Sequence, residues 1–231
     1  MKTILFDLDG TLLPMDQNEF TTAYMELLRT VFAKYGYGNE LIDVVWKGVA
    51  AMVKNDGSVT NEEAFWKTFA DFYGEKALAD KNLFDEFYRK EFNDLRSVCG
   101  YDENAAATVA VLKEKGFDIV LASNPIFPAD AQKNRMRWAG LNPDDFCLVT
   151  SYENSRYCKP NCDYYSEIIE KLKEKPLCMV GNDVVEDTPA KTVGIEVFLL
   201  TDCIINKRNE DLSSYRNGNF SDLLRYITQE F

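Results

Sequence analysis

The stretch ILFDLDGTLL, residues 4–13, places two carboxylates directly after a short apolar run. The run TILFD, residues 3–7, predicts a buried strand, because a short apolar run bounded by a polar turn is typical of one. Asp7 and Asp9 stand one residue apart at the end of that strand. Two like charges crowd together in a protein when an opposite charge offsets their repulsion. The stretch therefore indicates a charged ligand at the end of a strand.

From about residue 100, apolar runs alternate with segments of helical spacing. Strands that alternate with helices imply parallel pairing, and they predict a Rossmann-like α/β fold with a doubly wound parallel sheet. The predicted strands cover residues 117–124, 147–150, 177–183 and 195–200, and the predicted helices cover residues 103–115, 128–139, 161–174, 187–193 and 220–229.

Between Pro14 and about residue 97 the pattern is wholly helical. Apolar residues fall at helical spacing from Phe20 to Phe32, and further helices are expected over 40–54, 62–73 and 80–92. We therefore expect residues 1–14 and 98–231 to form an α/β core and residues 15–97 to form an inserted, all-helical cap. The insertion begins directly after the first strand, where open α/β sheets bind ligands, so it is expected to act as a lid.

The composition excludes several classes of function. The chain of 231 residues contains no His, which rules out Ser-His-Asp triads and histidine-ligated zinc. A net charge of -12 disfavours binding to nucleic acid or to anionic membranes. The six Cys show no paired CxxC spacing, and no apolar stretch is long enough to span a bilayer. We expect a cytoplasmic protein with free thiols.

The ends of the predicted strands carry a set of complementary polar groups. Because the carboxyl ends of parallel strands meet at one edge of a sheet, these groups are expected to lie close together. Mg²⁺ takes oxygen ligands and binds phosphate oxygens, while a lysine and a hydroxyl suit the remaining phosphate oxygens. The set therefore predicts Mg²⁺-dependent phosphoryl transfer, and it comprises Asp7, Asp9, Ser123, Asn124, Lys159, Asp183 and Asp187.

Four motifs, in order, resemble those of the haloacid dehalogenase (HAD) superfamily of Mg²⁺-dependent phosphohydrolases. They are FDLDGTLL, LASNP, the Lys of YCKPN, and VGNDVVED. The resemblance covers the whole core, and it covers the cap only in its position and helical character. It implies that Asp7 is the nucleophile that forms an aspartyl-phosphate and that Asp9 is the general acid–base.

The resemblance also implies how the phosphoryl group is held. Gly10 would permit the tight turn out of the strand, and Thr11 would orient the general acid–base. Ser123 and the backbone amide of Asn124 would bind phosphoryl oxygens. Lys159 would neutralise the nucleophile and the transferring group.

The implied metal ligands are Asp7, the backbone carbonyl of Asp9, and Asp183, with Asp187 as a supporting residue. The fourth motif departs from many relatives, because Asn182 stands where they have an acid directly after the glycine. The sequence thus leaves open whether Asn182 or Asp183 lies nearer to the metal.

The expected reaction is hydrolysis of a small phosphorylated metabolite, since a closing lid excludes large phosphorylated partners. Asp9 argues against a dehalogenase, whose halide leaves without a proton, and the absence of His fits a phosphomutase less well. Lys47 and Lys54 keep a phosphonatase open, and the turn over residues 54–58 is a candidate cap loop that reaches the site. A non-catalytic binding or regulatory protein that kept the fold is a further alternative, and either a monomer or a dimer fits the sequence.

Overall fold

A six-stranded parallel sheet organises the computed structural model, which describes residues 2–231. The strand order is β3-β2-β1-β4-β5-β6, so the order changes direction between β1 and β4. This arrangement confirms the predicted Rossmann-like, doubly wound fold, and it places the topological switch point beside the first strand. The strands are β1 (Lys2–Phe6), β2 (Phe117–Leu121), β3 (Leu148–Val149), β4 (Cys178–Gly181), β5 (Glu196–Leu200) and β6 (Arg216–Gly218).

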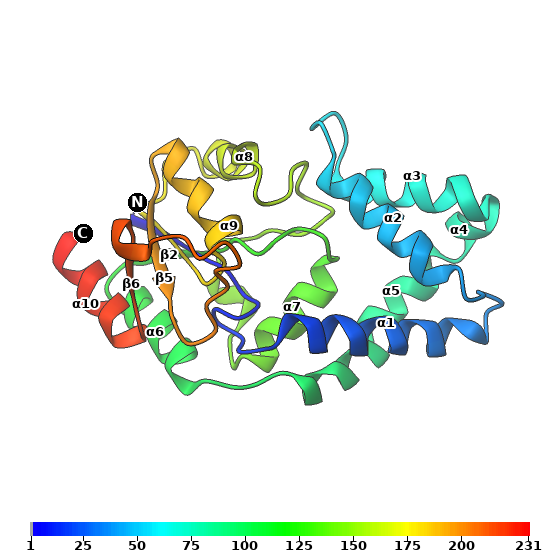
Figure 1. Ribbon diagram of the computed structural model, residues 1–231, viewed down its shortest axis with the longest axis horizontal. Helices are drawn as coiled ribbons and strands as arrows, with labels where there is room; N and C mark the ends of the chain where they lie inside the picture. Colours follow the sequence, from blue (N-terminus) through cyan, green and yellow to red (C-terminus); the bar gives the residue numbers. More distant parts are fainter. Residues whose placement is uncertain (1) are drawn as a thin grey trace.

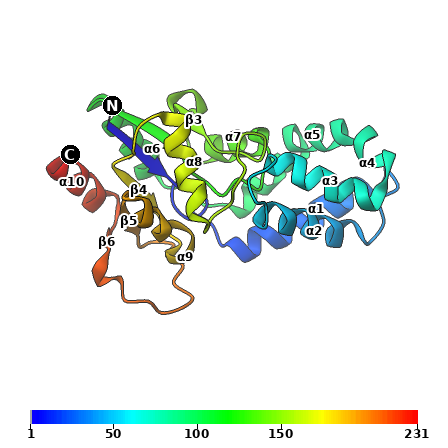
Figure 2. The ribbon, with the colours of Figure 1, turned by 90° about the horizontal axis from the view of Figure 1, so that it is seen from above.

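Helices cover both faces of the sheet (Figures 1 and 2). Side chains alternate along β1, so that Ile4 and Phe6 pack with α6, α7 and α10, whereas Leu5 packs with α8 and α9. The bounds are α6 (Glu103–Glu114), α7 (Ala129–Trp138), α8 (Cys162–Leu172), α9 (Val184–Asp187) and α10 (Phe220–Glu230), with 3₁₀ turns η2 (Pro143–Asp145), η3 (Thr188–Val193) and η4 (Leu212–Ser214).

The segment between β1 and α6 is helical, as predicted. It lies to the right of the sheet in Figure 1, away from the two termini. Its two ends run side by side, since Met15 and Cys99 form an antiparallel bridge and Gly100 N–H donates to Pro14 O at 2.7 Å. We keep residues 15–97 as the proposed cap. Its elements are α1 (Gln17–Ala33), α2 (Leu41–Val53), α3 (Asn61–Tyr73), α4 (Glu75–Ala79), α5 (Lys81–Arg89) and η1 (Glu91–Val98).

Local capping explains where two of these helices begin. The side chain of Asp16 accepts hydrogen bonds from the backbone of Asn18 and Glu19 at the start of α1. Thr60 and Glu63 form a capping box at the start of α3. These caps orient the first turns of the helices next to the sheet edge.

The proposed cap shares a hydrophobic core with the sheet domain. The ring of Phe127, which follows β2, lies 5.4 Å from Tyr24 and 6.1 Å from Phe92. Phe92 also stacks on Trp138 of α7 at 5.3 Å. On the other side, the buried side chain of Asn61 donates to Pro125 O at 3.2 Å. Contacts on both sides therefore set the position of the cap over the sheet edge.

Three elements differ from the sequence expectations. The helix expected over 80–92 ends at Arg89. The range 187–193 is mostly the 3₁₀ turn η3 rather than an α-helix, and it follows the one-turn helix α9, which Asp183 caps. The edge strand β6 has the sequence RNG, whose lack of apolar residues gave no strand signal.

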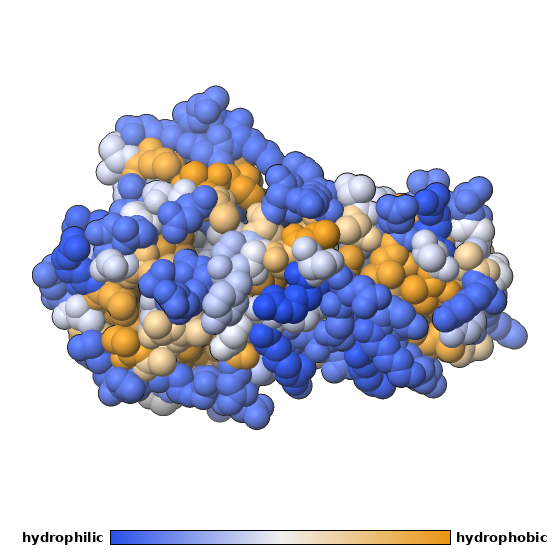
Figure 3. Space-filling model, turned by 90° about the horizontal axis from the view of Figure 1, so that it is seen from below, coloured by the Kyte–Doolittle hydropathy of each residue, from blue (hydrophilic) through white to orange (hydrophobic). Residues whose placement is uncertain are grey.

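On the face seen in Figure 3, hydrophilic side chains cover most of the surface and apolar ones emerge in separate patches. Within residues 2–231, no helix combines the length and the apolar character that crossing a bilayer requires.

Candidate active site

Asp7 lies at the switch point of the sheet, directly after β1. Its backbone N–H donates to Val180 O of β4 at 2.8 Å, so the nucleophile candidate is held at the junction of the two central strands. Ser123 follows β2 and Asn182 follows β4, on either side of it. The parallel sheet thus brings the first, second and fourth sequence motifs to one edge, as expected.

Lys159 connects two carboxylates beneath this edge. Its Nζ lies 3.0 Å from Asp7 Oδ1 and 2.7 Å from Asp187 Oδ1, and the side chains of Lys159 and Asp187 are almost completely buried. Burial raises the pKa of Asp7 to about 7, although the charge of Lys159 opposes this shift. Burial alone would lower the pKa of Lys159, yet Asp187 and Asp7 together hold it well above its usual range.

Asp187 is positioned by both of its oxygens. Its Oδ2 accepts the backbone N–H of Asp183 at 3.0 Å, while Oδ1 pairs with Lys159. A Cβ at Gly181 would lie 2.0 Å from this Oδ2, so only glycine leaves room for the carboxylate. Asp187 therefore acts in this structure as a support for Lys159 and for the loop of the fourth motif.

Thr11 does not orient Asp9, and that expectation is wrong. The Thr11 hydroxyl lies 3.0 Å from Asn182 Oδ1 and 3.3 Å from Asp7 Oδ2. Gly10 has a φ of +83°, and a Cβ there would lie 2.3 Å from Asn182 Nδ2, which explains the glycine between the two acidic positions and the threonine. Asn182 Nδ2 donates to Cys203 O at 2.7 Å, so the polar atoms of Asn182 are engaged within the protein.

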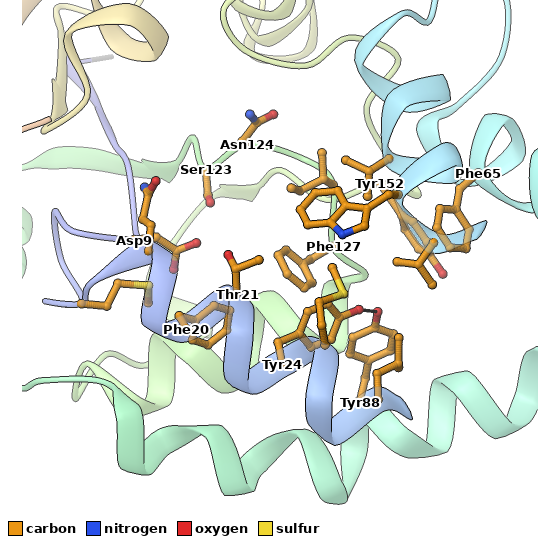
Figure 4. A pocket seen from close by; sticks show the side chains of 18 of the residues that line it. Asp9, Phe20, Thr21, Tyr24, Phe65, Tyr88, Ser123, Asn124, Phe127 and Tyr152 are labelled. Carbon is orange, nitrogen blue, oxygen red and sulfur yellow. Dashed lines mark hydrogen bonds between the residues drawn. The ribbon is translucent and has the colours of Figure 1, made fainter. Parts of the chain in front are cut away.

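Arg135 of α7 holds Asp9 instead. Its guanidinium is fully buried and forms an ion pair with Asp9 Oδ2. Gln132 Oε1 accepts from Arg135 Nη2 at 2.6 Å, and the guanidinium carbon lies 4.4 Å from the centre of the Phe127 ring. Asp9 Oδ1 is buried without a hydrogen-bond partner among the described residues, and Figure 4 shows Asp9 at the edge of the cavity.

Sequence reasoning missed Arg135, although a signal was present. The helix predicted over 128–139 has Ala131 and Met136 on its buried face, and Arg135 shares that face. An arginine at an apolar helical position requires a buried partner.

Ser123 lines the cavity close to Asp9 (Figure 4) and is nearly fully buried. Its carbonyl accepts from the hydroxyls of Thr150 at 2.7 Å and Tyr164 at 3.0 Å, which fixes the loop after β2. The backbone N–H of Asn124 donates to no described residue, so it is available for a ligand oxygen.

The side chain of Asn124 contacts the fourth motif. Its Nδ2 donates to the carboxyl group of Glu186 at 3.2 Å, and its Oδ1 is buried without a partner among residues 2–231. Burial raises the pKa of Glu186 to about 8. This carboxyl group, also missed in the sequence, lines the cavity beside the predicted metal ligands.

A cavity of about 180 Å³ lies between the sheet edge and the proposed cap. Lys47 and Lys54 do not line it; Lys47 is exposed, with its Nζ 5.7 Å from the centre of the Phe72 ring. No residue of the turn 54–58 lines it either, because that turn packs against Tyr157. The expectation that this turn reaches the site is wrong. The predicted site residues that do line the cavity are Asp7, Asp9, Ser123, Asn124, Asp183 and Asp187.

The donors at this edge fit a hard cation only as a mixed set. Within residues 2–231, no three acidic or Cys side chains stand close enough to hold a metal by themselves. The carbonyl of Asp9 accepts no hydrogen bond from a described residue, and Asp183 uses only Oδ1 to cap α9. Carboxylate oxygens of Asp7 and Asp183 with this carbonyl would suit Mg²⁺, which keeps several waters. The geometry favours Asp183 over Asn182 as a ligand.

Comparison with known proteins identifies a family and a fold. A family model described as haloacid dehalogenase-like hydrolase matches residues 1–191. No curated protein matches the sequence.

Several solved structures share the fold at low identity. A HAD phosphatase from Thermococcus onnurineus matches with a TM-score of 0.56 and 18% identity, covering 98% of each chain. The 2-haloacid dehalogenase from Pseudomonas syringae pv. Tomato matches with a TM-score of 0.63 and 18% identity, covering 99% of each chain. The hydrolase YfnB from Bacillus subtilis, described as bound to magnesium, matches with a TM-score of 0.53 and 17% identity, covering 98% of each chain. At such identities these likenesses show the fold alone.

Proposed function

Because the chain belongs to the haloacid dehalogenase-like hydrolases, we propose that it hydrolyses a small-molecule phosphomonoester through an aspartyl-phosphate on Asp7, with Mg²⁺ as cofactor. The observation that carries this proposal is that two neighbouring acids, Asp7 and Asp9, have different surroundings. Asp7 is paired with Lys159, whereas Asp9 presents an unpartnered Oδ1 near the same cavity. One acid is thus suited to attack and the other to proton transfer.

The chain's own residues account for the two halves of the reaction. An Asp7 carboxylate oxygen attacks phosphorus, while the Lys159 ammonium offsets the negative charge that gathers there. The Asp9 carboxyl group gives a proton to the leaving alcohol oxygen and then takes one from the water that attacks the aspartyl-phosphate. The Ser123 hydroxyl and the Asn124 amide bind the phosphoryl oxygens between these steps.

The cofactor assignment draws on the donor set and on the magnesium described in the Bacillus relative. Asp7, Asp183 and the Asp9 carbonyl would hold Mg²⁺, which supplies positive charge that brings the phosphoryl group to Asp7. The six free cysteines support the cytoplasm as the proposed location.

The alternative reactions find less support in the cavity. Neither Lys47 nor Lys54 lines it, so no cap lysine is placed to form the Schiff base of a phosphonatase. In a dehalogenase, the halide ion leaves without a proton, so that reaction would give Asp9 no role as an acid. Hydrolysis of a phosphomonoester therefore remains the proposal that uses both acids.

The test measures phosphate release from p-nitrophenyl phosphate with Mg²⁺, with EDTA, and in Asp7→Asn. We expect activity only in the wild type with Mg²⁺, and acid-quenched wild type should carry a phosphoryl adduct that Asp7→Asn lacks in intact-mass measurement. Asp71→Asn, an exposed position on α3, serves as the matched control and should retain full activity. Hydrolysis that survives in both EDTA and Asp7→Asn would refute the proposal.

A further inference from the structure

The cavity is chemically divided along its length. Asp9 and Ser123 lie at its sheet edge, and aromatic side chains extend from there toward Phe65 of α3 (Figure 4). The part that faces the cap is lined mainly by aromatic and aliphatic side chains, including Trp46, Val49, Phe65 and Trp66. The phosphoryl group occupies the polar end in the proposed function, so the leaving group meets the apolar end.

No lysine or arginine of the described chain lines this cavity, whereas five carboxyl groups do. A leaving group with a carboxylate or a second phosphate would therefore enter without a positive partner, and removing such a charge from water is costly. The cavity thus rejects anionic leaving groups.

The tyrosine hydroxyls that line the cavity are engaged with other lining residues, whereas the hydroxyl of Thr21 has no hydrogen-bond partner among the described residues. The Tyr24 and Tyr88 hydroxyls hydrogen-bond to each other at 2.7 Å, and Trp66 Nε1 donates to the Tyr152 hydroxyl at 3.4 Å. A sugar-like leaving group would bring several hydroxyls that need new partners, and an unpaired buried polar group is destabilising. The aromatic part of the lining, beyond Thr21, is therefore poorly suited to a polyol.

Two aromatic rings of the lining already have a cation nearby. Lys81 Nζ lies 6.0 Å from the centre of the Trp66 ring, and the Arg135 guanidinium lies 4.4 Å from that of Phe127. Each of these cations already lies against its ring, so the two rings are not free to bind a quaternary ammonium in the same way. The aromatic wall therefore favours a neutral occupant over a quaternary ammonium.

From these observations, and resting on the proposed phosphatase function, we propose that the substrate is a phosphate monoester of an uncharged, largely apolar alcohol about one aromatic ring in size. The volume sets the upper limit of this size: the phosphoryl group and the leaving group share about 180 Å³, and an apolar protein cavity of roughly 150 Å³ is enough to hold benzene. Trp46, Phe65 and Trp66 then determine specificity by covering the leaving group.

The test compares esters of primary alcohols, whose intrinsic reactivities are similar. We expect kcat/KM for phenethyl phosphate to exceed that for ethyl phosphate by roughly tenfold to hundredfold, because the ring is buried in the cavity. Glycerol phosphate, choline phosphate and phosphoglycolate should not exceed ethyl phosphate. If any of these three is a better substrate than phenethyl phosphate, the assignment of an apolar leaving group is wrong, although the phosphatase function stands. If no ester is hydrolysed, the proposed function fails and the inference fails with it.

Two variants test whether the aromatic lining of the cavity causes the preference for phenethyl phosphate. Trp46 lines the cavity but is 46% exposed, so Trp46→Ala should fold and should lower the phenethyl-to-ethyl ratio of kcat/KM about tenfold. Phe72, which is 52% exposed and lies outside the cavity, provides the matched control, and Phe72→Ala should leave the ratio unchanged. An unchanged ratio in Trp46→Ala, or an equal loss in Phe72→Ala, would contradict the role of the wall.

Discussion

The buried guanidinium of Arg135 holds one oxygen of Asp9, while the other oxygen is buried without a hydrogen-bond partner among the described residues. The pair joins α7 to the loop after β1, two segments that lie 126 positions apart in the chain. Arg135 touches no reacting atom, so in the proposed reaction it is a positioning residue. It orients the group that transfers the proton.

Arg135→Met tests this positioning. Displacing Asp9 by about 1 Å should lower kcat on the order of 100-fold, with a smaller change in KM. Breaking the buried pair should also destabilise the protein by about 3–5 kcal/mol, because the Asp9 carboxylate loses its partner. Steady-state kinetics and urea unfolding measure the two effects.

Arg137→Met, on the exposed face of the same helix, should change neither quantity. The double variant Arg135→Met/Asp9→Asn should be more stable than Arg135→Met, since both charges are then removed. If the two substitutions are simply additive in stability, Arg135 and Asp9 are not coupled and the positioning role is refuted.

Lys159→Met removes the positive charge shared by Asp7 and Asp187. The two carboxylates would then repel each other in a buried place, and we expect a loss of about 3–5 kcal/mol in the free energy of unfolding. Adding Asp187→Asn should restore part of this stability without restoring activity. Lys133→Met, at an exposed position, is the control. A Lys159→Met protein as stable as wild type would show that the ion pairs contribute no net stability.

Gly181→Ala should reduce activity by displacing Asp187, whose Oδ2 would lie 2.0 Å from the new Cβ. We expect at least a tenfold loss of kcat, of the order seen when a supporting residue is moved. Gly116→Ala separates this from a loss of stability: it has a φ of +83° with open space around a new Cβ, so it should cost about 1–2 kcal/mol and leave kcat unchanged. Equal kcat in wild type and Gly181→Ala would contradict the steric argument.

We expect the buried carboxyl group of Glu186 to make the stability of the protein depend on pH. Burial raises its pKa in the folded protein from 4.5 to about 8, so the folded state binds the proton more tightly than the unfolded state. Its contribution is therefore fully present below pH 4.5 and is lost as the pH rises toward 8. In thermal unfolding with EDTA, Glu186→Gln should flatten the fall in Tm across this window. If Tm changes by the same amount from pH 5 to pH 8 in the wild type and in Glu186→Gln, this assignment is contradicted.

The parts of the fold that depend on local pattern were predictable from the sequence. The central strands, the parallel sheet and the helical segment between β1 and α6 follow from apolar periodicity and turn residues. The short edge strand β6 and the 3₁₀ helix η1 did not follow, because neither has a repeating apolar pattern long enough to be distinguished from a loop.

The sequence by itself determined which chemical groups reach the sheet edge, because strand direction carries the residues after β1, β2 and β4 to the same side. Only the tertiary structure decided how those groups are partnered. Thr11 turns to Asn182, Arg135 reaches Asp9, and aromatic rings from separate helices close one cavity. These contacts join residues far apart in the chain, and their geometry comes from the packing of whole helices, which a pattern along one segment does not contain.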